Sequence, residues 1–155
     1  MKLKVLAVGQ KMPAWVNEGV EEYAKRLPGD FRLLIEEVAP GPRYAGADAA
    51  RAITKESQAL LGRIRPQDHV VALDVQGKSW SSEKLAQRAQ DWRMLGQDVV
   101  LLIGGPDGLS AECLARANER WSLSPLTLPH PLVRIVLAEQ LYRAWTLMSG
   151  HPYHR

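Results

Sequence analysis

A glycine-rich segment at residues 104–108 (GGPDG) has the composition of a ligand-binding loop. It follows an apolar run directly and precedes Ser110, which suits the N-cap of a helix. Glycine lets a backbone approach a cofactor closely because it carries no side chain. The spacing matches neither the GxGxxG dinucleotide fingerprint nor the GxxxxGK[ST] pattern of a P-loop. The segment therefore predicts either another kind of cofactor loop or a simple chain reversal at a sheet edge.

A second group of chemically capable side chains lies near the C-terminal end of the chain. Residues 129–155 contain three arginines against one glutamate, together with three of the four histidines. This basic excess supplies most of the formal net charge of +3. It suits an anionic partner, although a few solvated charges at a chain end would look similar. The His, Tyr and Arg side chains of this region are candidates for binding or catalysis.

Several common kinds of catalytic chemistry lack their motifs. The sequence contains no CxxC, no HExxH and no acidic cluster with the spacing of metal ligands, so we expect no metal. GxSxG is also absent. The single cysteine, Cys113, cannot form an internal disulfide and lies in an apolar helical stretch, where we interpret it as a packing residue. Hydrolytic nucleophiles and metal chemistry are both disfavoured.

The length and composition predict one domain over residues 1–155. The 155 residues are 46% apolar, and no repeat or long linker divides them. The N-terminus has no signal-peptide pattern, and no apolar run approaches the roughly 18 residues of a membrane span. We therefore expect a cytoplasmic protein that does not enter a membrane.

Apolar runs alternate with helical periodicity along the whole chain. We predict strands at 2–8, 31–38, 69–74 and 98–103, with a brief strand or extended loop at 121–128. We predict helices from Pro13 to about 27, at 48–64, from Ser81 or Ser82 to Gly96, and at 111–119 and 132–149. Residues 39–46 are rich in Gly and Pro and predict a mobile loop. This alternation predicts an α/β fold with a mostly parallel sheet flanked by helices.

The last predicted helix is apolar around nearly its whole circumference. Its polar residues form a narrow stripe in which Glu139 and Arg143 make an i,i+4 pair in the favourable order. A helix of this kind must be buried on nearly all sides. We expect a partner subunit to cover one face, the alternative being complete burial within one chain.

Several segments together resemble one protein family over the whole chain. They are LLIGGPDGLS (101–110), WSLSPLTLPHPLVRIVLAEQLYRAW (121–145), HPYHR (151–155), the opening MKLKVLAVGQKMPAWV and LDVQGKSWSS (73–82). The sequence is similar to the bacterial ribosomal large-subunit pseudouridine N3-methyltransferases, minimal members of the SPOUT class. The resemblance implies S-adenosylmethionine as methyl donor, a homodimer and a C-terminal trefoil knot. It also implies a pseudouridine target in the subunit-interface stem-loop of 23S rRNA, methylated in the assembled 70S ribosome.

The resemblance also implies which residues form the site. The cofactor site would comprise Leu73, Gly104, Gly105, Leu123, Ser124, Pro125, Leu126, Thr127 and Leu128. These positions follow predicted strands, and open α/β sheets bind ligands at the C-terminal ends of their strands. Leucine side chains and bare glycine peptides would suit an adenine ring.

Methyl transfer to a ring nitrogen requires alignment and an acceptor for the N3 proton. The catalytic candidates are His154 or Tyr153 near the proton, and Arg143 near a carbonyl or a phosphate. His130 would either be structural or orient the substrate. Two other functions remain open: a non-catalytic ribosome-binding protein with this fold, and a knotted methyltransferase for another RNA base.

Overall fold

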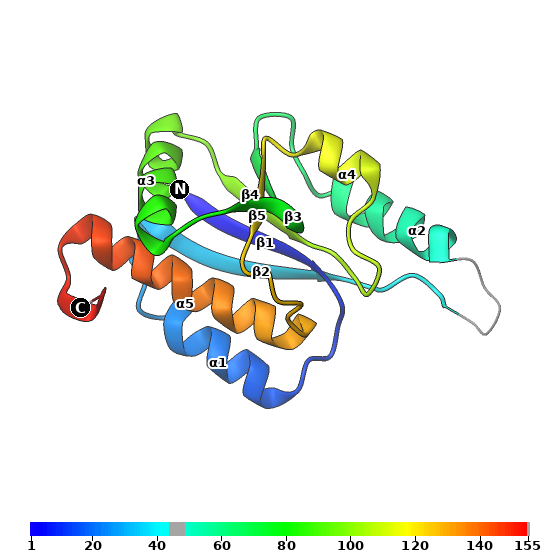
Figure 1. Ribbon diagram of the computed structural model, residues 1–155, viewed down its shortest axis with the longest axis horizontal. Coiled ribbons are helices and arrows are strands. Elements are labelled where there is room, and N and C mark those ends of the chain that lie inside the picture. The colour runs from blue at the N-terminus through cyan, green and yellow to red at the C-terminus, as the bar shows by residue number, and fades with distance from the viewer. Residues whose placement is uncertain (44–48, 155) are drawn as a thin grey trace.

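The computed structural model describes residues 1–43 and 49–154, with only the backbone at His154. Five parallel strands form one sheet in the order β2-β1-β4-β3-β5 (Figure 1). The strands are β1 (Lys2–Val8), β2 (Arg32–Val38), β3 (His69–Ser79), β4 (Val99–Ile103) and β5 (Glu119–Ser122). The predicted α/β fold with a parallel sheet is therefore confirmed.

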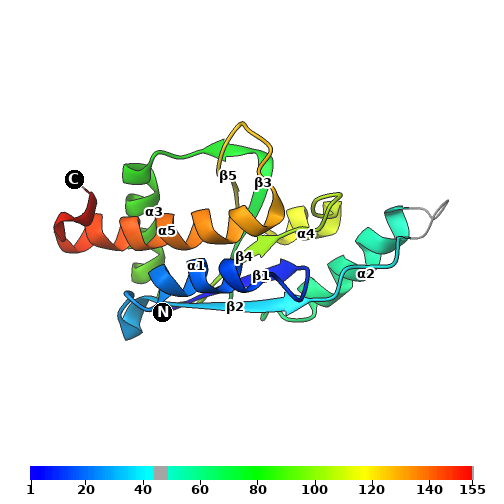
Figure 2. The same cartoon turned by 90° about the horizontal axis from the view of Figure 1, so that it is seen from below.

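Helices cover both faces of the sheet. They are α1 (Ala14–Ala24), α2 (Ala49–Leu61), α3 (Ser82–Leu95), α4 (Ala111–Arg116) and α5 (His130–Ser149), with short 3-10 turns η1 (Gly29–Phe31) and η2 (Pro152–His154). Helices α1, α3 and α5 pack on one face, and α2 and α4 pack on the other (Figures 1 and 2). Within the described ranges, no helix is long and apolar enough to cross a membrane.

The central strands are apolar along their length because each face of the sheet has its own core. Leu101 and Ile103 of β4 contribute to the core beneath α1, α3 and α5, while Leu102 faces the core beneath α2 and α4. All five residues of β4 are buried. Parallel sheets covered on both faces require such continuous apolar runs.

Several predicted boundaries are correct, and each has a local cause. The strand at 2–8 is β1. Of the two serines proposed as caps, Ser81 caps α3 by accepting a hydrogen bond from the Lys84 amide at 3.0 Å. Gly96 ends that helix with a φ of +69°, a conformation that favours glycine. Residues 39–43 contain no helix or strand, and the rest of the predicted 39–46 loop lies outside the described residues.

Other boundaries were wrong where tertiary contacts override local pattern. The helix predicted at 111–119 ends at Arg116, because the Asn118 side chain accepts a hydrogen bond from the Val70 amide at 2.8 Å and Glu119 begins β5. The strand predicted at 69–74 continues to Ser79 because its second half also pairs with β5. The segment proposed at 121–128 is split between β5 and a loop.

Helix α5 lies between α1 and α3 against the sheet. One side is fully covered within the chain, including Leu137, Leu141 and Ala144. The opposite side is only partly covered, and Leu132 is 41% exposed. The chain therefore buries part of this apolar helix itself. A partner over the remaining face stays a prediction.

Candidate active site

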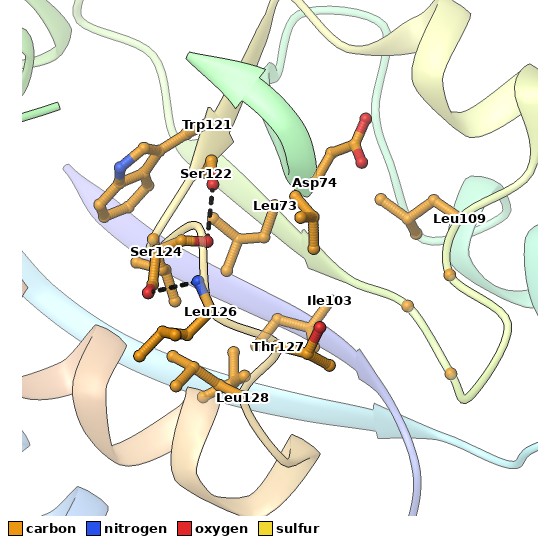
Figure 3. A pocket seen from close by; sticks show the side chains of 16 residues that line it. Leu73, Asp74, Ile103, Leu109, Trp121, Ser122, Ser124, Leu126, Thr127 and Leu128 are labelled. Carbon is orange, nitrogen blue, oxygen red and sulfur yellow. Dashed lines mark hydrogen bonds between the residues drawn. The ribbon is translucent and has the colours of Figure 1, made fainter. Parts of the chain in front are cut away.

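Three chain segments meet in a cleft at one end of the sheet (Figure 3). One segment follows Leu73 in β3, the second follows Ile103 at the end of β4, and the third follows Ser122 at the end of β5. Side chains of Leu73, Ile103, Leu126 and Leu128 line it, with Trp121 at one side. This is the edge where parallel α/β sheets commonly bind ligands.

Eight of the nine residues proposed for the cofactor site line this cleft: Leu73, Gly104, Gly105, Leu123, Ser124, Leu126, Thr127 and Leu128. Pro125 belongs to the same loop but is exposed and does not line the cleft. Eight further residues that line it were not predicted from the sequence: Asp74, Val75, Ile103, Gly108, Leu109, Trp121, Ser122 and Val133. The hydrophobic contributors had no distinguishing signal, because an apolar residue after a strand is common.

The glycine-rich segment forms a tight turn. The Gly108 amide donates to the Gly105 carbonyl at 3.0 Å, and Gly108 has a φ of +79°. A Cβ on Gly104 would lie 2.6 Å from the Gly108 backbone, so this position admits no side chain. A Cβ on Gly105 would point at Glu56 and Val8, 3.0 Å from each. The expectation that a bare Gly105 makes room for the ligand is therefore corrected, since its missing side chain makes room for Glu56.

An ion pair between the partly exposed Arg43 and the buried Glu56 supports this turn. The Glu56 side chain on α2 is only 3% exposed and accepts hydrogen bonds from Arg43 Nη1 at 2.6 Å and from the Gly41 amide at 2.8 Å. Arg43 Nε also donates to Asp107 in the turn at 2.9 Å. We call Arg43, Glu56 and Asp107 the arginine clamp. It joins the segment after β2, helix α2 and the glycine-rich turn, and it was not predicted from the sequence.

The loop after β5 is held by its own serines. Ser122 Oγ donates to the Ser124 carbonyl at 3.1 Å, and Ser124 Oγ accepts from the Leu126 amide at 2.9 Å (Figure 3). These bonds leave the Leu126 side chain 70% exposed at the rim of the cleft. An exposed leucine beside a cleft can cover a bound apolar group at little conformational cost.

Asp74 is the one ionisable side chain among the residues lining the cleft. Its Oδ1 accepts a hydrogen bond from the Gln76 amide at 3.2 Å, which fixes the carboxylate just after the buried part of β3. The cleft therefore combines apolar walls, bare backbone and a single negative charge, and it suits a ligand with an aromatic ring and a cationic centre.

His130 lies behind the glycine-rich turn, outside the cleft lining. Its Nε2 lies 3.5 Å from Arg134 Nη2. Burial and the charge of Arg134 lower the pKa of His130, so the ring is neutral at pH 7. Arg134 is itself buried, pairs with Glu37 and donates to the Gly9 carbonyl at 3.0 Å. These contacts suit a structural role for His130.

The C-terminal candidates gather at the other end of α5. Arg143 donates to Glu139 Oε1 at 2.7 Å, and the Tyr153 hydroxyl donates to the same oxygen at 3.1 Å. The predicted Glu139–Arg143 pair is thus confirmed. The Arg143 guanidinium also lies over the Tyr153 ring, 5.1 Å from its centroid. The side chain of His154 and the whole of Arg155 lie outside the described residues.

The two halves of the proposed site are far apart within one chain. An α-helix rises about 1.5 Å per residue, so Arg143 lies roughly 20 Å along α5 from His130. Figure 2 places the C-terminal turn and the loop after β5 toward opposite ends of this helix.

Burial and the Glu139 charge raise the pKa of Tyr153, so its phenol remains protonated at neutral pH. In the described part of the chain, no cluster of His, Cys, Asp or Glu could hold a metal ion.

Comparisons with known proteins agree along the full sequence. The model of a family described as "Predicted SPOUT methyltransferase" matches residues 1–154. A protein of Chromohalobacter salexigens is 63% identical over 155 residues and one of Hahella chejuensis is 57% identical, with 99% or more of each relative covered. A Marinomonas protein is 56% identical over its full length. Each of the three is named "Ribosomal RNA large subunit methyltransferase H".

Proposed function

Because this chain belongs to the SPOUT methyltransferase family, we propose that it methylates N3 of a pseudouridine in 23S ribosomal RNA. The target would lie in the subunit-interface stem-loop of the assembled 70S ribosome. Full-length similarity to proteins named as ribosomal RNA large subunit methyltransferases supports the substrate class. Family membership also implies the C-terminal trefoil knot, a rare departure from unthreaded chains. The cleft built by three strand ends is the observation that carries the proposal.

The cleft has the chemical features that S-adenosylmethionine requires. Leu73, Ile103 and Leu128 offer apolar surfaces for an adenine ring. The bare peptides of the glycine-rich turn and the loop after β5 offer backbone donors and acceptors. Asp74 provides one negative charge for a ligand whose sulfonium and ammonium groups outweigh its carboxylate. We therefore propose this cleft as the cofactor site, with no metal involved.

When bound, S-adenosylmethionine supplies a methyl group already activated by its sulfonium, so the protein mainly aligns the reacting atoms. The N3–H of the target base ionises well above neutral pH, and a side chain must accept or share its proton. Burial and the Glu139 charge raise the pKa of Tyr153, and its hydroxyl donates to Glu139, so we propose that it serves as a hydrogen-bond donor. His154 remains our candidate for the acceptor. Arg143 would stabilise charge on the carbonyls beside N3.

The distance between the tail and the cleft favours a site shared by two copies of the chain. Arg143 and Tyr153 are held at the end of α5 farthest from the cleft by Glu139. A second copy packed antiparallel along the partly covered face of α5 would bring its tail to this cleft. We therefore propose a homodimer in which the tail of one subunit completes the cleft of the other. An enzyme acting on ribosomes would work in the cytoplasm.

Mixing two inactive variants tests this arrangement. Gly105→Val would displace Glu56 and deform the cofactor cleft, while Arg143→Ala would disable the tail. Each variant alone should fail to methylate ribosomes. After subunit exchange at equal amounts, half of the dimers are mixed and each has one intact site, so about a quarter of wild-type activity should return. Mixtures that stay inactive, while native mass spectrometry detects mixed dimers, would contradict a shared site.

A further inference from the structure

An irregularity in the sheet places a second surface beside the cleft. Strands β3 and β5 pair at Leu73 with Trp121, and Trp121 then pairs again with Lys78. Residues 74–77 therefore have no partner in β5 and project from the sheet as a bulge. Gly77 lies against the Arg120 backbone, where a Cβ would be only 2.7 Å away. The bulge is thus fixed closely against β5.

The bulge separates two concave surfaces of the protein. Asp74 and Val75 line the cofactor cleft on one side. Gln76 and Gly77 line a separate groove on the other side, together with residues of β5 and the first turns of α3. Trp80 in this groove stacks on Trp121 of the cleft, with ring centroids 5.0 Å apart and an angle of 16°. The stacked rings of Trp80 and Trp121 therefore connect the base of the groove to the base of the cleft.

The groove is cationic, and we define it by Lys78, Lys84, Arg88 and Arg120. Its one acidic residue is Glu119, whose carboxylate accepts hydrogen bonds from Arg88, His69 and Trp92 at 2.7–2.8 Å. The Glu119 charge is therefore already paired with Arg88. Lys78, Lys84 and Arg120 are all exposed, and none forms an ion pair within residues 1–43 and 49–154. Three free cations therefore face the solvent together.

We propose that this cationic groove binds the sugar–phosphate backbone of ribosomal RNA that flanks the methylated nucleotide. Phosphates at the regular spacing of a nucleic-acid strand suit a row of unpaired Lys and Arg side chains. Because residues 74–77 separate the groove from the proposed cofactor cleft, an RNA strand bound in the groove would lie beside that cleft. The proposal rests on the proposed function and adds a contact surface outside the cleft and the tail.

Charge removal with a matched control tests the groove. The groove variant is Lys78→Gln/Lys84→Gln/Arg120→Gln. The control is Arg32→Gln/Arg51→Gln/Lys55→Gln, which removes three exposed cations on β2 and α2. The groove variant should raise KM for 70S ribosomes at least tenfold and lower the log–log salt slope by about 2 to 3, near 0.7–0.9 for each phosphate contact. Its affinity for S-adenosylmethionine and its kcat should stay at the wild-type level.

The possible results separate the inference from the proposed function. Groove and control variants with the same KM and salt slope would overturn the groove while leaving the methyltransferase activity in place. A wild-type protein that does not methylate ribosomes would instead overturn the proposed function.

Crosslinking from the groove distinguishes RNA from a ribosomal protein as its partner. Lys84→Cys can carry a photoreactive label selectively because the native Cys113 is buried. Crosslinks from active enzyme to 23S rRNA near the methylated nucleotide support the proposal. Crosslinks confined to a ribosomal protein would contradict it.

Discussion

At the scale of single residues, the arginine clamp explains why the glycine-rich turn has its sequence. Gly104 is bare because the Gly108 backbone lies against it, and Gly105 is bare because Glu56 occupies the adjacent space. The family pattern therefore reflects the construction of the turn as well as access for a ligand. The clamp left no signal in the sequence, since Arg43 lies in a predicted loop 13 residues before Glu56, and no sequence pattern links a loop arginine to one particular residue of the next helix.

Glu56→Gln should loosen the turn and weaken cofactor binding. The substitution removes the charge that Arg43 and the Gly41 amide share, so the turn loses its support. We expect the dissociation constant for S-adenosylmethionine to rise about tenfold, equivalent to roughly 1.4 kcal/mol. Titration calorimetry with the purified variant measures this dissociation constant. The control is Glu36→Gln, an exposed ion-pair partner of Lys4 and Arg63, which should leave binding unchanged. Equal affinities in a folded Glu56→Gln protein would contradict the role of the clamp.

Tail variants should separate chemistry from cofactor binding. Arg143→Ala, Tyr153→Phe and His154→Ala should keep the affinity for S-adenosylmethionine within a few-fold, because the tail of the second subunit would lie over the methyl group and would not form the apolar walls proposed for the adenine ring. Ribosome methylation should fall by roughly 10²-fold for the residue that handles the proton. Single-turnover methylation and calorimetry on the same preparations measure both quantities.

The pH profile identifies the proton acceptor. If His154 accepts the proton, the rate should rise with pH through about 6.5, the ordinary pKa of histidine. Tyr153 cannot produce this rise because its pKa is raised and its phenol stays protonated. A wild-type profile that is flat from about pH 5.5 to 8, with full activity in His154→Ala, would remove His154 from the mechanism.

At the scale of elements, sequence periodicity predicted which helices and strands exist but not where tertiary contacts end them. The short α4 and the long β3 both depend on β5, an edge strand of four residues. Asn118 and Glu119 read as the end of a helix by local pattern, yet their side chains bond to β3 and α3. A four-residue strand with three polar residues is too short for periodicity to detect.

Glu119→Gln should destabilise the protein by about 1–3 kcal/mol at pH 7, since three donors lose a charged acceptor. Burial alone would raise the pKa of Glu119, but the bonds from Arg88, His69 and Trp92 outweigh it and lower the pKa. The folded carboxyl thus has a lower pKa than the unfolded one. Its contribution is complete above the unfolded pKa of about 4.3 and is lost as pH falls through the folded value.

Urea unfolding at pH 7, 5 and 3 measures this contribution. The gap between wild type and Glu119→Gln should be constant from pH 7 to 5 and should shrink by pH 3. Asp91→Asn is the control, because Asp91 contacts the same Arg88 but is 59% exposed, and it should change stability by less than about 1 kcal/mol. A gap that widens at acidic pH would refute the assignment.

At the scale of the whole molecule, α5 joins the cofactor cleft, the tail and the expected subunit contact. Its apolar circumference predicted burial and a partner over one face. The structure buries one side of the helix within the chain and leaves the other side partly covered, where a partner stays a prediction. Leu141 belongs to the core of its own chain and is fully buried, so Leu141→Glu would unfold the protein and report nothing about a dimer. The sequence pattern could not make this division because both sides are equally apolar.

Leu132→Glu should yield a folded monomer. Leu132 is 41% exposed in the single chain, so a charge there costs little until a partner covers it. Sedimentation at micromolar concentration should find a dimer for the wild type and a monomer for Leu132→Glu, with similar circular dichroism. The monomer should also lose ribosome methylation. A wild-type protein that sediments as a folded monomer would contradict the shared site.

The central claim is that this chain methylates N3 of a pseudouridine in 23S rRNA of assembled ribosomes. Mass spectrometry of rRNA nucleosides from a deletion strain, before and after complementation with this chain, tests it most directly. We predict that N3-methylpseudouridine is absent from the deletion strain, returns with the wild-type chain and does not return with Gly105→Val. An unchanged nucleoside profile in the deletion strain, or a methyl group restored on a different base, would contradict the account.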